Sequence, residues 1–197
     1  QVVIAPQFDN AQEFSEGLAA IGVGGKYGFI NPKGELVINP QFDSADSFSE
    51  GMAPVWIGRK TGFVDQKGTL VISPQFDQAQ GFVDDLCAVM VEDKWGYIDK
   101  TGKYVIGPQY QGARPFLHGL AAVQIEDKYG FIDETGRNVI EPQFALWSAA
   151  GFSEGLSPIS IDDKKGYVDR SGKVTMLPEF SSVFSSVEAF SEGLAVV

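Results

Sequence analysis

The sequence predicts an all-β protein made of tandem 34-residue repeats, each a three-stranded meander, and two recurring landmarks support this fold class. The first landmark is a proline followed by Gln-Phe, Gln-Tyr or Glu-Phe, with successive spacings of 34, 34, 34, 34 and 36 residues, at Pro6, Pro40, Pro74, Pro108, Pro142 and Pro178. The second is a glycine after Tyr, Thr, Trp or Lys, which keeps the same step at Gly28, Gly62, Gly96, Gly130 and Gly166. A constant period of this length indicates one supersecondary unit per repeat.

The repeats predict a single array over residues 1–197 rather than separate domains. Five full units run from one proline to the next, with partial units at both ends of the chain. The units are residues 6–39, 40–73, 74–107, 108–141 and 142–177, followed by the partial unit 178–197.

The first strand of each unit is predicted from apolar residues that alternate with other residues between turn signals. In the fourth unit it covers residues 120–125, Leu-Ala-Ala-Val-Gln-Ile. Ala121, Val123 and Ile125 lie on one face, and the other units repeat this small-then-branched pattern. We expect this face to be buried.

The second and third strands form a hairpin. Residues 129–132, Tyr-Gly-Phe-Ile, make the second strand, in which Gly130 indicates close approach of another backbone. The turn from Asp133 to Gly136 suits a type I turn closed by a glycine bulge. The third strand is predicted over residues 138–140, and Pro142 is expected to end it because proline lacks a backbone donor.

These residues resemble a known family, the WG-repeat proteins. The family pattern runs through Gly-Leu-Ala, Lys-Trp-Gly-Tyr-Ile-Asp and Val-Ile-x-Pro-x-Tyr to Phe-Ser-Glu-Gly, and residues 94–99 match its central motif at every position. The other units depart from it, with Tyr27, Thr61, Tyr129 and Lys165 at the tryptophan position. Phe-Ser-Glu-Gly also becomes Phe-Val-Asp-Asp at residues 82–85 and Phe-Leu-His-Gly at 116–119. The resemblance implies a bacterial tandem β module with a general interaction role and no established catalytic residues.

One meander cannot bury both of its faces, so the repeats are expected to stack on their neighbours. We expect an open solenoid-like or superhelical array. The alternative is a closed β-propeller-like ring, although a four-stranded propeller blade typically takes about 40 to 45 residues.

Composition argues against several partners. The chain has 26 acidic and 15 basic residues, a formal net charge of -11, and its basic residues are dispersed. Nucleic acids and anionic membranes both require clustered Lys and Arg, so neither is expected as a partner. No apolar run reaches the roughly 18 residues of a membrane span. The chain opens with Gln1, which fits both an exported protein, secreted or on the cell surface, and a fragment of a longer one.

Candidate catalytic residues occupy recurring positions, and no enzyme, metal site or cofactor is predicted. Cys87 takes the position of Ala53 and Ala121, which indicates a small buried residue. His118 stands where other repeats have Glu or Asp, and it is the single histidine of the chain. The serines of Phe-Ser-Glu-Gly have no neighbouring base and are interpreted as turn residues. The acidic pairs follow no calcium-loop pattern and are interpreted as solvated turns.

All but four of the aromatic residues occupy recurring positions, and these four are the candidate partner-binding residues. They are Trp56, Tyr104, Trp147 and Phe184. Trp147 and Phe184 lie in the two longest connectors, and exposed loop aromatics are favoured contact residues. The structural alternative is that they fill gaps between repeats.

Two functions remain open from the sequence. The first is a non-catalytic protein-interaction or scaffolding module. It includes self-association through the terminal edge strands, Val2 to Ile4 and Leu194 to Val197, which present incomplete meanders. The second is a multivalent small-ligand or carbohydrate binder with one site per repeat, built from an aromatic residue and a turn carboxylate.

Overall fold

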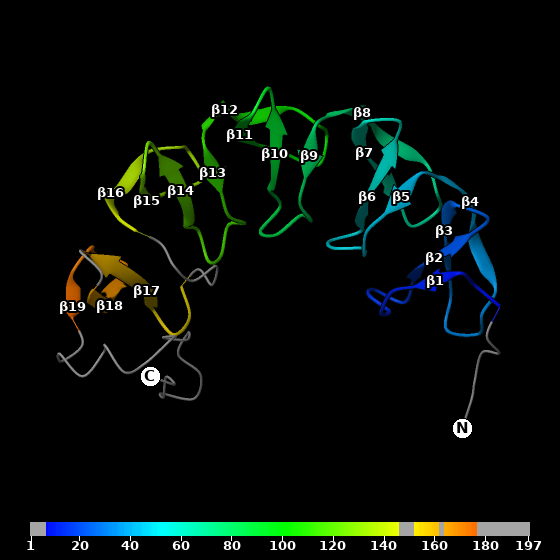
Figure 1. The fold of residues 1–197 in the computed structure, drawn as a ribbon, viewed down its shortest axis with the longest axis horizontal. Coiled ribbons are helices and arrows are strands. Elements are labelled where there is room, and N and C mark those ends of the chain that lie inside the picture. The colour runs from blue at the N-terminus through cyan, green and yellow to red at the C-terminus, as the bar shows by residue number, and fades with distance from the viewer. Residues whose placement is uncertain (1–6, 146–151, 162–163, 177–197) are drawn as a thin grey trace. The chain divides into compact units, whose positions relative to one another are not determined.

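Antiparallel strands are the only regular elements in the residues that the structure describes, which are 7–145, 152–161 and 164–176 of a computed structural model (Figure 1). This confirms the all-β class and the tandem organisation. The terminal strands and the Trp147 and Phe184 connectors lie outside the described residues. Within them, no helix has the length and apolar character needed to cross a bilayer.

Each of the first four repeats folds into its own four-stranded sheet, in which strands adjacent in sequence are adjacent in space. The sheets comprise β1 (Asn10–Ala11), β2 (Ala19–Val23), β3 (Lys26–Ile30) and β4 (Leu36–Phe42); β5 (Ser44–Ala45), β6 (Met52–Ile57), β7 (Lys60–Asp65) and β8 (Leu70–Phe76); β9 (Gln78–Ala79), β10 (Cys87–Val91), β11 (Lys94–Ile98) and β12 (Tyr104–Tyr110); and β13 (Gly112–Ala113), β14 (Ala121–Ile125), β15 (Lys128–Ile132) and β16 (Asn138–Phe144). A fifth sheet contains β17 (Leu156–Ile161), β18 (Lys164–Asp169) and β19 (Val174–Met176).

The fourth strand corrects the predicted three-stranded meander. The connector after each third strand contributes a two-residue strand that pairs with the first strand, as in Ser44 opposite Trp56 and Ala45 opposite Val55. Two residues are too few to show a period of two, so the sequence pattern could not reveal this strand.

The third strand passes through its proline, contrary to the prediction that Pro142 ends it. β16 pairs with β15 through Ile140 opposite Phe131 and again through Phe144 opposite Tyr129, with a bulge between these pairs. Proline is tolerated in a bulge because its missing N–H is not needed there.

The bulge explains the repeated glycine of the second strand. A Cβ atom at Gly130 would lie 2.6 Å from the carbonyl oxygen of Ile140 and 2.7 Å from the nitrogen of Pro142. Real Cβ atoms do not approach backbone this closely, so the position requires glycine. The predicted close backbone approach at Gly130 is confirmed.

The predicted face of the first strand is buried only over its first two positions. Ala121 and Val123 are buried, whereas Ile125 is 39% exposed and its counterpart Ile57 is 45% exposed. The prediction was wrong for these isoleucines because the end of the strand extends into the solvated turn. Ala122, on the opposite face, is buried, so both faces of this strand are packed at its start.

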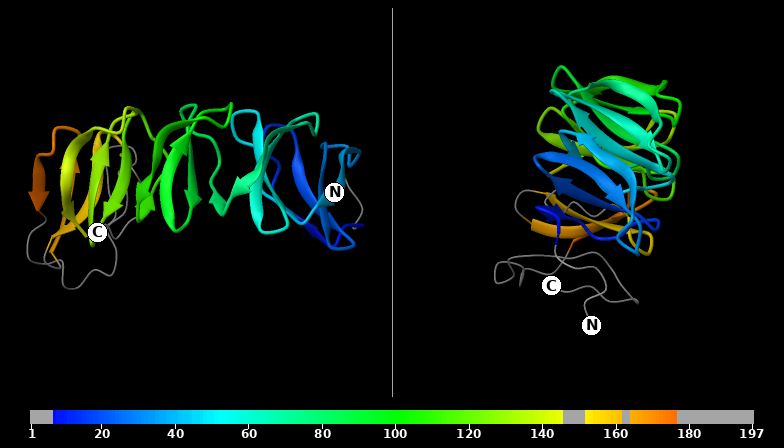
Figure 2. Two further views of the ribbon diagram at one scale, coloured as in Figure 1. Left: turned by 90° about the horizontal axis from the view of Figure 1, so that it is seen from above. Right: turned by 90° about the vertical axis from the view of Figure 1, so that its right-hand side faces the viewer.

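The chain divides into two units, Gln1–Asp93 with Tyr97–Tyr104 and Lys94–Gly96 with Val105–Val197, and each is described by itself. In the first unit, one core joins Phe29 of β3 to Val55 of β6, so successive sheets stack on each other. In the second unit, Phe131 of β15 and Ile159 of β17 share a core in the same way. This stacking is the solenoid-like arrangement that the repeats predict, and no described sheet closes into a barrel (Figure 2).

Aromatic pairs strengthen the stacking within both units. The connector phenylalanine of one repeat packs against the second-strand phenylalanine of the preceding repeat. The ring centroids of Phe29 and Phe48 are 4.8 Å apart, and those of Phe131 and Phe152 are 4.7 Å apart. These distances are typical of favourable aromatic contacts.

Candidate interaction surface

The turn between the second and third strands has the predicted design. In the fourth repeat, the Gly136 N–H donates to the Asp133 carbonyl at 2.9 Å, and Gly136 has a φ of 83°. The Asp133 carboxylate accepts hydrogen bonds from the Thr135 hydroxyl and N–H and from the Arg137 N–H. These bonds, the Thr135 hydroxyl first, lower the pKa of Asp133. The turn carboxylate is therefore an ionised structural cap.

In the first four repeats, the third strand begins with exposed apolar side chains shortly after this turn. In the first unit they are Leu36, Val37, Leu70, Val71 and Tyr104, exposed by 41 to 51%. We call these five residues the aliphatic row. The second unit carries counterparts at Val105 and Val139, also exposed. The next residue of each strand is buried: Ile38 follows Leu36 and Val37, and Ile72 follows Leu70 and Val71. The row therefore lies beside the core.

The turns that precede the row residues pack on the neighbouring repeat within the first unit. A Cβ atom at Gly68 would lie 3.2 Å from the Ile38 side chain, and one at Gly102 would lie 3.1 Å from Ile72. The hairpin of each repeat thus rests on the third strand of the preceding repeat. Tyr104 contacts Phe76 edge-on, with ring centroids 6.3 Å apart.

Exposed lysines accompany the aliphatic row. Lys33, Lys67 and Lys103 lie in the turns or strand starts that precede its side chains, and all three are exposed. Among the described residues, none of their amino groups lies within 4.0 Å of a carboxylate. An apolar surface edged by exposed cations therefore recurs in this acidic chain.

The Phe-Ser-Glu-Gly turns hold successive repeats in this register. Ser15 Oγ donates to the Phe48 carbonyl at 2.7 Å, and Ser49 Oγ donates to the Phe82 carbonyl at 2.6 Å. Each serine hydroxyl thus donates a hydrogen bond to a backbone carbonyl of the following repeat. We call this contact the serine clasp. The sequence interpretation as turn residues was incomplete, because spacing alone does not reveal a bond to the next repeat.

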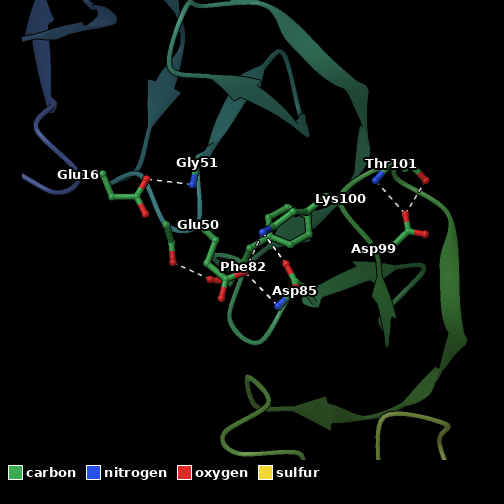
Figure 3. A network of polar contacts seen from close by, with 9 residues as sticks. Glu16, Glu50, Gly51, Phe82, Asp85, Asp99, Lys100 and Thr101 are labelled. Carbon is green, nitrogen blue, oxygen red and sulfur yellow. Dashed lines mark hydrogen bonds and ion pairs between the residues drawn. The ribbon is translucent and has the colours of Figure 1, made fainter.

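The glutamate of the same motif adds a second bond between repeats (Figure 3). Glu16 accepts a hydrogen bond from the Gly51 N–H at 2.9 Å, and Glu50 accepts one from the Asp85 N–H at 3.0 Å. Lys100 lies 2.6 Å from Asp85 and 3.2 Å from Glu50. The hydrogen bond to Asp85, more than that to Glu50, raises the pKa of Lys100. This network ties the third repeat to the second.

Of the four predicted partner-binding residues, Tyr104 lies in the aliphatic row and Trp56 lies outside it. Trp56 is half-buried and faces Thr61 across β6 and β7, in a position that the fold itself explains. Trp147 and Phe184 lie outside the described residues. Partner binding by all four stays a prediction. Leu36 and Leu70 were missed because a third strand of alternating residues is expected to bury one face, and aliphatic residues there suggest core.

The two residues considered above as catalytic candidates, Cys87 and His118, lie in the core and in a turn. Cys87 is fully buried, and burial raises its pKa to about 12, so the thiol stays protonated. His118 occupies the second position of the tight turn from Leu117 to Leu120, with a φ of 55°. Within the described ranges, no three His, Cys, Asp or Glu side chains gather as metal ligands would.

Stacked small sheets joined by serine clasps define a β-repeat protein with a recurring surface row. The chain belongs to the family of WG containing repeat proteins, whose model matches it six times, at residues 1–27, 27–60, 62–95, 95–129, 129–164 and 166–197. The resemblance seen in residues 94–99 is therefore confirmed over nearly the whole chain. A sequence comparison with curated proteins finds no match.

Two solved structures share the fold at low sequence identity. A eukaryotic initiation factor has a TM-score of 0.57 and 15% identity, over 89% of this chain and 56% of that chain. Kluyveromyces lactis Hsv2p has a TM-score of 0.51 and 8% identity, over 85% of this chain and 62% of that chain. This chain thus spans less than two thirds of both proteins, and at these identities the likeness concerns the fold alone.

Proposed function

We propose that the chain is a non-catalytic interaction module that binds a protein partner through the aliphatic row. The observation that carries this proposal is the recurrence of exposed apolar side chains at the start of the third strand in four successive repeats, from Leu36 to Val139. Exposed apolar side chains that lie in one continuous patch mark interaction sites, whereas isolated ones do not. The stacking of Gly68 on Ile38 brings the turn that precedes Leu70 against the third strand that begins with Leu36.

The alternative of a carbohydrate binder with one site per repeat has less support. It requires an exposed aromatic residue and an available turn carboxylate in every repeat. The second repeat has Thr61 at the aromatic position, and the Asp65 carboxylate accepts hydrogen bonds from the Lys67 and Thr69 N–H groups of its own turn. The surface residues that do recur are aliphatic.

Site-specific photo-crosslinking tests the proposal. A photoreactive phenylalanine analogue placed at Leu70 should capture a protein in extracts of the producing cell, whereas the same analogue at Ile57 should not. Ile57 is the matched control because it is 45% exposed and Leu70 is 41% exposed in the same repeat.

The captured protein must then be purified and rebound. Its binding should weaken strongly with Leu36→Ser/Leu70→Ser and stay unchanged with the control Val23→Ser/Ile57→Ser. Equal binding by both double variants would place the partner elsewhere and overturn the proposal.

A further inference from the structure

We propose that the aliphatic row takes a protein segment in which carboxylates alternate with aliphatic side chains. This inference rests on the proposed function and adds the chemistry of the partner. It follows from the charges that edge the row and from how the other charged groups of the same turns are engaged.

The lysines beside the row differ from the other lysines of the first unit. Lys26 is paired with Asp43 at 2.5 Å, Lys60 with Asp77 at 2.6 Å, and Lys100 with Asp85 at 2.6 Å. Lys33, Lys67 and Lys103 form no such pair with any described carboxylate. The amino groups of Lys67 and Lys103 act on Asp65 and Asp99 of their own turns only by a Coulomb interaction over more than 4.0 Å. All three lysines are exposed, so a partner can reach their amino groups.

The carboxylates of the same turns point into the turns. Asp99 accepts hydrogen bonds from the Thr101 N–H and hydroxyl and from the Lys103 N–H. Glu35, which directly precedes Leu36, accepts a hydrogen bond from the Asn31 side chain at 2.7 Å. These acids accept hydrogen bonds from donors of their own turn, whereas no hydrogen bond or ion pair within 4.0 Å holds the lysine amino groups, so the exposed lysines are available to a partner.

The overall charge of -11 does not prevent an acidic partner from binding here. At physiological ionic strength, exposed charges more than about 8 Å apart are largely screened from each other. A carboxylate held against the row therefore responds mainly to the adjacent lysines. The aliphatic side chains add affinity because their contact removes apolar surface from water.

Fluorescently labelled peptides test the proposed chemistry in physiological salt by anisotropy. The acidic probe repeats Glu-Leu-Glu-Ser, and matched probes repeat Gln-Leu-Gln-Ser, Lys-Leu-Lys-Ser and Glu-Ser-Glu-Ser. We expect the acidic leucine peptide to bind more tightly than the other three. Thermal melts check that every variant protein is folded.

Two charge-matched triple variants separate local from overall charge. Lys33→Gln/Lys67→Gln/Lys103→Gln should weaken binding of the acidic probe roughly threefold or more, since exposed ion pairs contribute modestly. Arg59→Gln/Lys94→Gln/Lys128→Gln removes the same charge from exposed positions on the other hairpin turns and should leave binding unchanged. Equal losses in both triple variants would show a non-local charge effect and overturn the inference.

The outcomes distinguish the inference from the proposed function. If the glutamine probe binds as tightly as the acidic probe and Leu36→Ser/Leu70→Ser abolishes both, the aliphatic row binds peptides but the acidic chemistry is wrong. If the Leu36→Ser/Leu70→Ser variant binds every probe as tightly as the wild type does, the aliphatic row is not the binding surface and the proposed function is also wrong. A concentration-dependent mass that this double variant abolishes would assign the row to a second copy of the chain, and selective binding to phosphatidylglycerol vesicles would assign it to a membrane; each result overturns the inference.

Discussion

Trp56 of β6 lies directly opposite Thr61 of β7, and this pair reverses the arrangement found in the first repeat. There Gly22 lies opposite Tyr27, and a Cβ atom at Gly22 would lie 3.6 Å from the Tyr27 ring. In the second repeat the aromatic residue is Trp56 on the first strand, whereas in the first repeat it is Tyr27 on the second strand. Thr61 is fully buried. Aromatic residues commonly stabilise a small residue across two strands in this way.

The reversed pair predicts energetic coupling. Trp56→Gly should reduce the free energy of unfolding by about 1 to 2 kcal/mol through lost packing, and Thr61→Tyr should cost about 1 to 3 kcal/mol through overpacking. The double variant recreates the Gly22–Tyr27 pair, so its loss should be at least about 1 kcal/mol smaller than the sum of the two single losses. Urea unfolding of the four proteins measures this coupling, and additive losses would contradict it.

The buried hydroxyl of Thr61 gives a second prediction. Its oxygen has no hydrogen-bond partner in the structure, although the side chain is fully buried. An unsatisfied buried polar group typically costs about 1 to 3 kcal/mol. Thr61→Val should therefore raise the free energy of unfolding by about 1 kcal/mol. Thr175→Val, at an exposed strand position, is the control and should have little effect; a destabilised Thr61→Val would show that the hydroxyl is satisfied in solution.

Local features of the repeat were predictable, whereas contacts between repeats were not. The Asp133 turn and the close approach at Gly130 follow from residue types whose backbone requirements are specific. The serine clasp from Ser49 to Phe82 joins residues 33 positions apart, and no local pattern distinguishes it from an ordinary turn serine. Leu70 is likewise exposed at 41%, although its residue type suggests a core position. Periodicity therefore reveals the unit, but packing between units determines its surface.

A third prediction concerns the glycine that faces the proline bulge. A Cβ atom at Gly96 would lie 2.6 Å from the Ile106 carbonyl oxygen and 2.7 Å from the Pro108 nitrogen. Because both are backbone atoms, Gly96→Ala forces the strands apart and should cost about 3 kcal/mol. Gly107→Ala is the matched control in the facing strand, since nothing lies within 4 Å of its Cβ position. Equal urea midpoints for the two variants would show that the bulge accommodates a Cβ atom at position 96 with little loss of stability.

A fourth prediction concerns the serine clasp. Ser49→Ala removes the hydroxyl donor from the carbonyl of Phe82, a buried residue, and should cost about 1 kcal/mol. Ser73→Ala, at an exposed strand position, should change the free energy of unfolding by less than about 0.5 kcal/mol. If both substitutions have the same effect, the clasp contributes nothing to stability.

The last prediction follows from the turn aspartates. Hydrogen bonds lower the pKa values of Asp65, Asp99, Asp133 and Asp169, with the Thr69 N–H first for Asp65 and a Thr or Ser hydroxyl first for the other three. A carboxyl group whose pKa is lower in the folded chain than in the unfolded chain contributes stability above the unfolded value, about 3.9. That stability is lost as the pH falls through the folded value. Stability should therefore decline below about pH 4.

The first repeat supplies the matched substitution for this test, because Asn31 occupies the aspartate position and its Oδ1 accepts the same two backbone N–H bonds, from Lys33 and Glu35. Replacing all four aspartates by Asn keeps the acceptors and removes the titrating groups. The variant should lose little stability at pH 7 and show a shallower decline between pH 4 and pH 2. Thermal melts across this range compare it with the wild type and with Asp93→Asn/Asp127→Asn, a control at two exposed turn positions. If the quadruple variant declines as steeply as the wild type, other carboxylates govern the acid sensitivity.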